Sequence, residues 1–428
     1  MAVSPGSGRL TPHSGSETTP TSSLRESKAP HLSVVYLDHC AQLSGGEIAL
    51  ARLVASWPGS DVHCQVVLGE HGLLEDLLTD SADVRVVPLP DSARQLRRAA
   101  VKPGIALLKS LWETARYVIR LASDLRRRSP DLVVTNSLKS ALYGAVASRL
   151  AGVPVIWHQR DRVAPDYLPR SAVLLVRLAA RLLPDGVIAN SQTTLATLHL
   201  PVKAKGRPVT AVIGDPFERP GPARARQDGP LVVGMVGRLA SWKGQDIFLR
   251  AFARAFPDGP ETALVVGGAL FGEDDYAASL PALASSLGLD GRVRFTGHVT
   301  DVGSYYGEMD VLVHASTVAE PFGQVVVEGM AEGIPVVAAA AGGPTEIITH
   351  DVDGILYPPS DVEALAAALR QLAEDPLRRQ RIGAAGLLAA GRFAPAVIAR
   401  ETESAYRRVL ERQRGRRTRR RPSSAGHE

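Results

Sequence analysis

Cysteine is scarce in this sequence: 428 residues contain only Cys40 and Cys64. Two thiols cannot build a disulfide framework, and their positions do not match the spacing of a metal-binding motif. We therefore expect both to be buried core thiols. This usage indicates a reducing cytoplasm.

Long apolar runs are also lacking. No stretch reaches the roughly 20 apolar residues that a membrane-spanning helix needs. Residues 1–30 are rich in Ser, Thr, Pro and Gly and lack the apolar core of a signal peptide, so we expect a disordered segment there. No repeat of solenoid period is present. The chain is long enough for two globular domains, each with its own core.

Short apolar stretches alternate with helical patterns in both halves of the chain, which predicts parallel sheets covered on both faces. The segment 214–230, rich in Pro, Gly, Arg and Asp, has the composition of an interdomain linker. The predicted strands are 33–40, 62–68, 84–89, 132–135, 153–157, 186–189, 231–236, 263–266, 292–295, 311–314 and 334–340.

Two carboxylates mark the strongest functional pattern. Glu320 lies on a Pro321-Phe322-Gly323 loop, and Glu328 follows about two turns into a predicted helix. Free backbone N–H groups and a helix N-terminus favour an anionic ligand. A second tight turn follows the next strand at Gly342-Gly343-Pro344. Ligands bind at this edge of an open α/β sheet, although two surface glutamates on an ordinary loop are the alternative.

A second pattern places two cations on one glycine-rich loop. Gly237-Arg238-Leu239 follows the strand 231–236, and Lys243-Gly244 comes shortly after it. An arginine fork and a lysine point charge can stabilise negative charge on phosphate groups without a metal ion. The alternative is a pair of solvated surface cations.

The first half offers weaker signals. Gly45 and Gly46 form a turn after the first strand, where backbone amides can approach a phosphate or an acceptor. His158 stands at the end of the strand 153–157, where ligands bind, although it could be an ordinary loop histidine. Arg160 and Arg162 are weaker candidates for acceptor or phosphate contacts.

Together these motifs resemble those of the retaining glycosyltransferases of family 4, also called glycosyl transferases group 1, which have the GT-B fold. The family carries two glutamates separated by seven residues, with Pro-Phe-Gly after the first, as from Glu320 to Glu328. It also carries the Gly-Arg-Leu and Lys-Gly pattern of residues 237–244. The resemblance spans residues 34–412.

The resemblance implies an α/β fold of two facing Rossmann-like doubly wound domains, with a C-terminal helix that crosses back. It places the acceptor-side domain at 31–215, the linker at 216–230, the nucleotide-sugar donor domain at 231–395 and the crossover helix at 396–413. A basic disordered tail would follow at 414–428.

The implied reaction transfers a sugar from a nucleotide donor, a UDP-sugar first of all, with retention at the anomeric carbon. In the family, a histidine at the position of His158 contacts the transferred sugar. Arg238 and Lys243 would stabilise the diphosphate, and Glu320 would bond sugar hydroxyls. Glu328 would accept from the nucleotide ribose. The remaining donor-binding candidates implied by the resemblance are Gly45, Gly46, Gly237, His298, Phe322 and Gly323.

This chain departs from the family pattern at two places. Gly-Gly-Glu at 45–47 replaces the usual Gly-Gly-Ala-Glu, which leaves the role of Glu47 open, and the Gly214–Phe217 segment is a shortened version of the usual linker turn. No Asp-x-Asp motif is present where a metal-dependent fold would need it, so we expect metal independence and no cofactor. Rival functions are a sugar-nucleotide epimerase, a phosphorylase and a noncatalytic nucleotide-sugar-binding subunit. No segment resembles the pyridoxal lysine site that the phosphorylase needs.

The acceptor-side segments 94–109 and 160–170 contain no motif, so the acceptor stays open among a cell-envelope glycan, a lipid and a small molecule. The basic and apolar mixture of 94–128 suits a membrane surface, an anionic acceptor or a solvated helix. Seven arginines between Arg412 and Arg421 are typical of a disordered tail, with peripheral contact to the anionic inner membrane face as the alternative. Nothing points to nucleic acid as a substrate.

Overall fold

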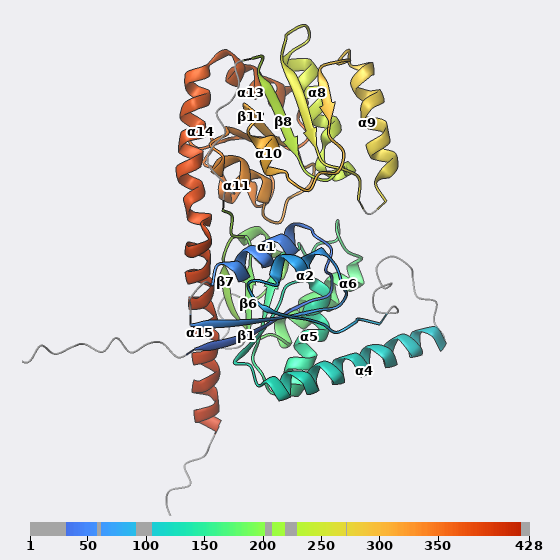
Figure 1. Cartoon of the computed structure of the whole chain (residues 1–428), viewed down its shortest axis with the longest axis vertical. Helices are drawn as coiled ribbons and strands as arrows, with labels where there is room; N and C mark the ends of the chain where they lie inside the picture. The colour runs from blue at the N-terminus through green and yellow to red at the C-terminus, as the bar shows by residue number, and fades with distance from the viewer. Residues whose placement is uncertain are drawn as a thin grey trace, which may run out of the picture.

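The computed structural model describes residues 31–57, 61–90, 105–201, 208–218, 229–270 and 272–420. Within them, two parallel sheets form the centres of two domains stacked along the long axis of the molecule (Figure 1). The predicted N-terminal disordered segment, the residues before 105 in the segment 94–128, most of the linker and the tail beyond 420 lie outside these ranges.

The first domain is built on a seven-stranded parallel sheet with strand order β3-β2-β1-β4-β5-β6-β7. The chain order reverses between β1 and β4, which is the switch point of a doubly wound sheet. The strands are β1 (Leu32–Asp38), β2 (Val62–Leu68), β3 (Asp83–Val86), β4 (Leu132–Thr135), β5 (Val155–Gln159), β6 (Gly186–Ala189) and β7 (Val209–Val212).

Helices cover both faces of this sheet. Successive residues of a strand point to opposite faces, so Val34 and Tyr36 of β1 pack in one apolar cluster while Val35 and Leu37 pack in another. The helices of the first domain are α1 (Gly45–Ala55), α2 (Leu73–Leu78), α4 (Ile105–Arg128), α5 (Leu138–Ala151), α6 (Arg170–Leu182) and α7 (Gln192–Thr197).

The second domain repeats this plan on a six-stranded parallel sheet with order β10-β9-β8-β11-β12-β13. Its strands are β8 (Val232–Val236), β9 (Thr262–Val266), β10 (Val293–Phe295), β11 (Val311–His314), β12 (Val336–Ala339) and β13 (Ile355–Tyr357). Its helices are η1 (Ser241–Lys243), α8 (Gln245–Ala255), α9 (Asp274–Ser286), α10 (Gly303–Tyr306), α11 (Gln324–Ala331), α12 (Pro344–Ile347) and α13 (Val362–Glu374).

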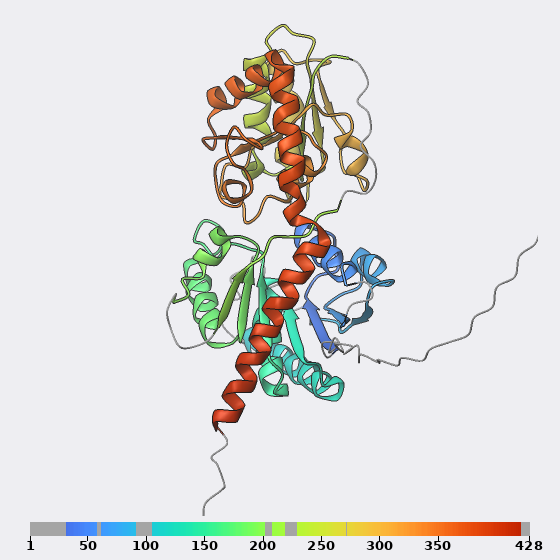
Figure 2. The ribbon, with the colours of Figure 1, turned by 90° about the vertical axis from the view of Figure 1, so that its left-hand side faces the viewer.

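The C-terminal segment returns to the first domain. Helix α14 (Pro376–Ala390) packs on α11, a short η2 turn (Gly391–Phe393) follows, and α15 (Pro395–Arg420) runs along the first domain, where it contacts α1 and β7 (Figure 2). Helix α15 continues seven residues past the predicted end at 413. Arginine is a strong helix former, and Pro422 is the first later residue in the sequence that would block the helix.

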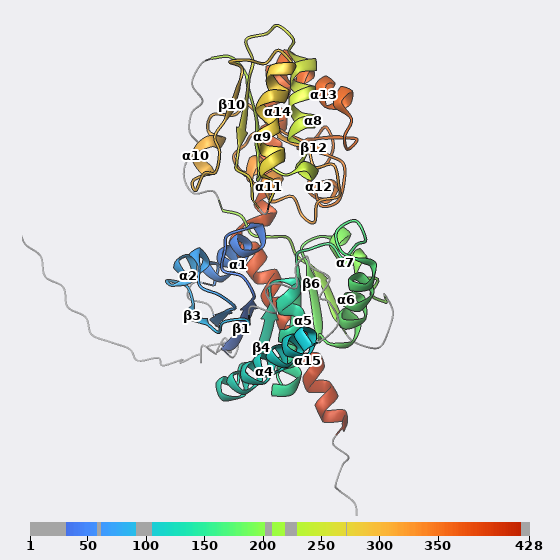
Figure 3. The same ribbon diagram turned by 90° about the vertical axis from the view of Figure 1, so that its right-hand side faces the viewer.

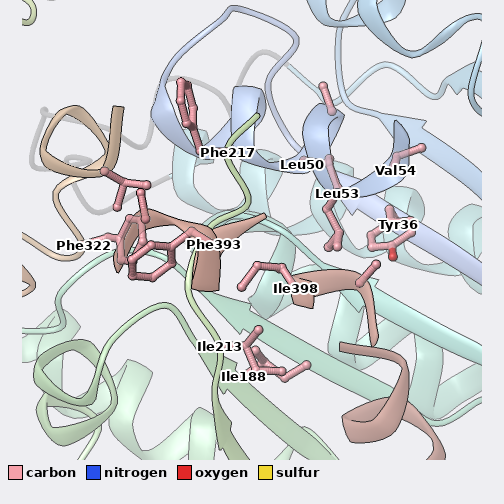
Figure 4. Close-up of a cluster of buried hydrophobic side chains, with 14 of the residues drawn as sticks. Tyr36, Leu50, Leu53, Val54, Ile188, Ile213, Phe217, Phe322, Phe393 and Ile398 are labelled. Carbon is pink, nitrogen blue, oxygen red and sulfur yellow. The ribbon is translucent and has the colours of Figure 1, made fainter. Parts of the chain in front are cut away.

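By length and composition, the stretch Pro376–Arg416 could also cross a membrane, in contrast to the expectation that no stretch is long enough. In this structure the same stretch packs against both domains. Apolar side chains from both domains meet at its η2 turn, where Phe322 and Phe393 lie edge to face with ring centroids 5.5 Å apart (Figure 4).

Candidate active site

The centre of the site is an ion pair between the two loops that the sequence singled out. Lys243 Nζ lies 3.0 Å from Glu320 Oε1 and 2.9 Å from Glu320 Oε2. Lys243 ends η1 after β8, and Glu320 follows β11, which pairs with β8 in the sheet. A backbone hydrogen bond of 2.8 Å from Thr317 N to Trp242 O joins the two loops.

Two further side chains hold the Glu320 carboxylate. Ser316 Oγ donates to Glu320 Oε2 at 2.8 Å, and His314 Nε2 lies 3.4 Å from the same oxygen. Burial alone would raise the pKa of Glu320, but the Lys243 ammonium and the His314 ring outweigh it and hold this pKa well below its ordinary value. The carboxylate is therefore ionised and able to accept hydrogen bonds.

The Glu320 backbone is fixed by the Gly342-Gly343 turn that was predicted beside it. Gly343 N donates to Glu320 O at 2.9 Å, and Glu320 N donates to Ala341 O at 3.2 Å. Gly342 has φ +78°, and a Cβ atom there would lie 2.2 Å from Glu320 O. Only glycine therefore allows the backbone of this turn to approach the loop so closely.

The second predicted cation belongs to the same cluster. Arg238 Cζ lies 5.5 Å from the centre of the Trp242 ring, and Lys243 Nζ lies 4.3 Å from it. The preceding Gly237 has φ +146°, in the region that favours glycine. The structure thus brings Arg238 and Lys243 to one aromatic side chain, and Lys243 also contacts Glu320.

Glu328 has a different set of partners. Both terminal nitrogens of Arg52 lie 3.2 Å from Glu328 Oε1, and Tyr306 OH donates to Oε2 at 2.7 Å. The ion pair ties α1 of the first domain to α11 of the second. Within the described residues, no hydrogen bond or ion pair links Glu328 directly to Glu320.

The predicted glycine turn of the first domain lies against the start of α11. A Cβ atom on Gly45 would come within 3.0 Å of Gln324 Oε1. The Gln324 amide, oriented so that both of its ends find partners, donates to Gly45 O at 3.3 Å and accepts from Arg52 at 2.7 Å. Gly46 is more open, since a Cβ atom there would lie 3.5 Å from Arg160 Cδ. The start of α11, which Gly323 precedes with φ +102°, therefore faces the Gly45 turn.

His158 is buried at the end of β5, and its Nε2 atom has no hydrogen-bond partner in the structure. Burial, followed by the Arg160 guanidinium, lowers the pKa of His158 well below its ordinary value, so the ring is neutral. Arg160 itself is buried and donates to Asn136 at 2.9 Å and to Asp215. Arg160 therefore belongs to a buried internal network, and its contact with an acceptor or a phosphate group stays a prediction.

First-domain residues hold the backbone on both sides of Glu320. Arg162 Nη1 donates to Ala319 O at 3.1 Å, and Ser191 Oγ donates to Pro321 O at 2.5 Å. Glu320 therefore lies where the two domains meet. Ser191 also caps α7, since its side chain accepts a hydrogen bond from Thr194 N.

Two donor-binding candidates, Phe322 and His298, lie in different surroundings. Phe322 is 5% exposed and packs on Phe393, so its side chain belongs to the apolar junction and only its backbone could meet a ligand. His298 is exposed, and its backbone lies against the Gly268 turn, where a Cβ atom would come within 2.9 Å of His298 N.

Sequence reasoning missed four side chains that hold the two glutamates: Arg52, Tyr306, His314 and Ser316. His314 stands at the carboxyl end of β11 just as His158 stands near that of β5, so its position alone was an available signal. Arg52 reaches Glu328 from the other domain and Tyr306 from a separate helix of the same domain, and no local pattern marks either residue. Among the described residues, no group of three or more His, Cys, Asp or Glu side chains could hold a metal ion.

Comparisons with known proteins identify the family of this chain. The family described as Glycosyltransferase Family 4 matches residues 44–211, and the family described as Glycosyl transferases group 1 matches residues 221–387. A D-inositol 3-phosphate glycosyltransferase from a Nocardioides strain is 29% identical over 80% of this chain and 82% of its own length. An exopolysaccharide phosphotransferase from Streptomyces coelicolor is 29% identical over 75% of this chain, but the match spans only 33% of that protein.

The fold also matches a solved structure. HepE from Anabaena, crystallised in complex with UDP and glucose, superposes with a TM-score of 0.73 at 29% identity, over 87% of this chain and 99% of that one. The expected GT-B fold of two doubly wound domains is thereby confirmed. On the two family matches, the relatives and the fold together, this chain belongs to the GT-B glycosyltransferases of family 4, the glycosyl transferases group 1.

Proposed function

We propose that this glycosyltransferase takes a UDP-sugar as donor, retains the anomeric configuration and needs no divalent metal ion. One observation carries the proposal. The Lys243–Glu320 pair, with Arg238 beside it, lies at the domain junction, where a cation for the diphosphate and a carboxylate for sugar hydroxyls are both available. UDP in the HepE complex supports the choice of nucleotide.

In the proposed reaction, the bond between the anomeric carbon and the diphosphate oxygen breaks while the acceptor oxygen attacks from the same face of the sugar. The acceptor proton passes to the leaving phosphate, so no separate base is required. Arg238 and Lys243 stabilise the charge that the diphosphate gains in the transition state. Glu320, kept ionised by Lys243, accepts hydrogen bonds from sugar hydroxyls and fixes the ring.

Glu328 is proposed to accept from the nucleotide ribose. In this structure Arg52 and Tyr306 hold its carboxylate. Ribose binding would then require Glu328 to share or exchange these partners. For the acceptor we propose a hydroxyl group of a cell-envelope or exopolysaccharide precursor in the cytoplasm, in line with the exopolysaccharide relative.

The test measures UDP release with a panel of nucleotide sugars and with glycan, lipid and small-molecule acceptors. We expect turnover with a UDP-sugar, unchanged by EDTA, and a product with the donor's anomeric configuration by NMR. An epimerase would convert the nucleotide sugar without an acceptor, and a binding subunit would release no UDP. Loss of turnover in EDTA, or an inverted product, would overturn the corresponding part of the proposal.

Variants test the assigned roles. Lys243→Ala and Glu320→Ala should each lower kcat by about 100-fold or more, because each removes charge stabilisation or positioning in a buried site. Arg254→Ala removes one partner of the exposed ion pair between Arg254 and Glu363 and serves as the matched control. If the two site variants stay within about threefold of wild type, near 0.7 kcal/mol of barrier, the roles are wrong.

A further inference from the structure

Exposed apolar side chains gather on one face of the first domain. Helices α4, α5 and α6 pack on the sheet face away from α15, as Figures 1 and 3 show together. These three helices carry ten of the nineteen large hydrophobic side chains that are exposed in the described residues. The ten are Leu108, Leu111, Trp112, Ile119, Val146, Leu150, Leu174, Leu175, Leu178 and Leu182.

Helix α6 has two apolar faces. Val173 and Val176 are buried against the sheet, as is usual for a helix of this layer. Leu174, Leu178 and Leu182 follow one another at intervals of four residues on the outward side and are 67%, 55% and 59% exposed. This spacing places the three leucines in one stripe that faces away from the core.

Helix α4 repeats the arrangement. Leu108, Trp112 and Ile119 are 68%, 57% and 62% exposed, and their spacing of four and then seven residues again gives a single outward stripe. The Arg116 guanidinium lies 4.8 Å from the centre of the Trp112 ring. An amphipathic tryptophan beside an arginine is typical of side chains at a lipid–water boundary.

The polar side chains around these stripes carry mostly positive charge. Helices α5 and α6 contain no acidic residue. On α4, Glu113 faces Lys109 at 3.9 Å, and Asp124 is bound by Arg85, Arg127 and Arg128. The exposed basic residues of the three helices include Lys109, Arg116, Arg120, Arg149, Arg170 and Arg181.

The positive charge distinguishes between two possible partners for this surface, a second copy of the chain and an anionic lipid bilayer. In a two-fold dimer the same patch would face itself, and arginines would meet arginines with few carboxylates to pair them. An anionic lipid surface instead offers apolar chains for the leucines and phosphate groups for the arginines.

We propose that the outward face of α4, α5 and α6, defined by the ten apolar residues above, is a docking surface for an anionic lipid bilayer. This surface differs from the arginine-rich C-terminus, which could bind a membrane only by charge. The surface would bind both by insertion of apolar side chains and by electrostatic attraction. Helix α6 begins eight residues after Arg162, which contacts the Glu320 loop. Docking would therefore hold the acceptor-side segment near the membrane surface.

The test is flotation of the full-length protein with vesicles of phosphatidylcholine alone or of equal parts phosphatidylcholine and phosphatidylglycerol. Wild type should float with the anionic vesicles and stay behind with the neutral ones. Leu174→Ser with Leu178→Ser should weaken partitioning by about tenfold or more. Arg170→Gln with Arg181→Gln should weaken it by roughly tenfold and reduce its sensitivity to salt.

The matched control is Leu73→Ser with Leu77→Ser. These leucines are 61% and 50% exposed on α2, which packs in the other apolar cluster, so the pair removes similar exposed surface and should leave flotation unchanged. Thermal melts of every variant show that it is folded. Tryptophan emission should shift to the blue on anionic vesicles, and Trp112→Phe should abolish this shift.

Three results would overturn the proposal. One is a wild-type protein that does not bind anionic vesicles at low salt. Another is an equal loss in the α2 control. The third is a loss of binding on replacing Arg412, Arg414 and Arg416 of α15 by glutamine while the α6 variants bind as wild type, because the docking surface would then be the C-terminal helix.

Discussion

Two buried histidines, one from each domain, share an unusual property. His158 Nε2 near the end of β5 and His314 Nδ1 at the end of β11 are both buried, and the structure gives neither atom a hydrogen-bond partner. An unpaired buried polar atom costs about 1–3 kcal/mol. At the ligand-binding edge of a parallel sheet, such atoms are expected where a ligand supplies the missing partner. His314 therefore joins His158 as a candidate for contact with the donor or acceptor.

Glu47 allows a pH test at the scale of one residue. Burial, followed by repulsion from Asp38, raises its pKa from 4.5 to about 6. The folded protein therefore binds the proton more tightly than the unfolded chain, and stability falls as the pH rises from about 4.5 through about 6. The shift of about 1.5 units corresponds to roughly 2 kcal/mol. Glu47→Gln should remove this fall and be more stable than wild type above pH 6.

Urea unfolding of both proteins across this pH range measures the difference. Glu411→Gln removes the same charge from an exposed position on α15 and is the matched control. A stability difference between Glu47→Gln and wild type that does not change with pH would contradict the prediction.

Among the elements, the buried strands were the most predictable. The predicted strands 62–68, 132–135, 186–189 and 311–314 match β2, β4, β6 and β11, because each is a short stretch of mainly apolar, β-branched residues. Strands β7 and β13 were not predicted. Both lie at the edge of their sheets. No residue of β7 is fully buried and β13 has only three residues, so neither is marked by an apolar run like those of β4, β6 and β11.

The functional loops were predictable for a different reason. Glycine and proline mark a tight turn in the sequence itself, so the loops around Lys243 and Glu320 could be located and their proximity inferred from the parallel sheet. The partners of Glu328 could not be predicted from the sequence. Arg52 lies 276 positions away in the chain, and only the packing of α1 against α11 brings the two together.

The Gly342 turn provides a test at the scale of an element. Gly342→Ala adds a Cβ atom 2.2 Å from Glu320 O at φ +78°, whereas Gly288→Ala has nearly the same φ, +71°, with no atom within 4 Å. The control should lose about 1 kcal/mol from backbone strain alone. Gly342→Ala should lose about 2–5 kcal/mol, because overpacking adds to the strain.

Activity separates the two variants further. Displacement of the Glu320 loop should lower UDP release by Gly342→Ala, while Gly288→Ala should retain wild-type turnover under conditions where both are folded. Equal losses of stability in denaturant unfolding, with equal activities, would show that the close contact does not constrain the loop.

On the scale of the whole molecule, the C-terminal helix α15 returns to the first domain and connects the two domains. The Arg52–Glu328 ion pair and the Phe322–Phe393 contact join the domains beside the site, and α15 then covers the first sheet. One apolar cluster contains residues from both domains (Figure 4). The last helix is therefore part of the core of the first domain, although 370 residues separate Tyr406 from Tyr36.

Tyr406 tests this coupling. Its side chain is fully buried, its ring centroid lies 6.4 Å from that of Trp57, and its hydroxyl lies 3.2 Å from the Tyr36 hydroxyl. Tyr406→Ala should cost about 3–5 kcal/mol through the cavity it leaves, and hydrogen exchange should rise first in β1 and α1. Tyr406→Phe keeps the volume and should cost only about 1–3 kcal/mol, for the Tyr36 hydroxyl left without its partner. Faster exchange in β8 and β11 with β1 unchanged would mean that α15 stabilises the second domain instead, and that the first domain folds without it.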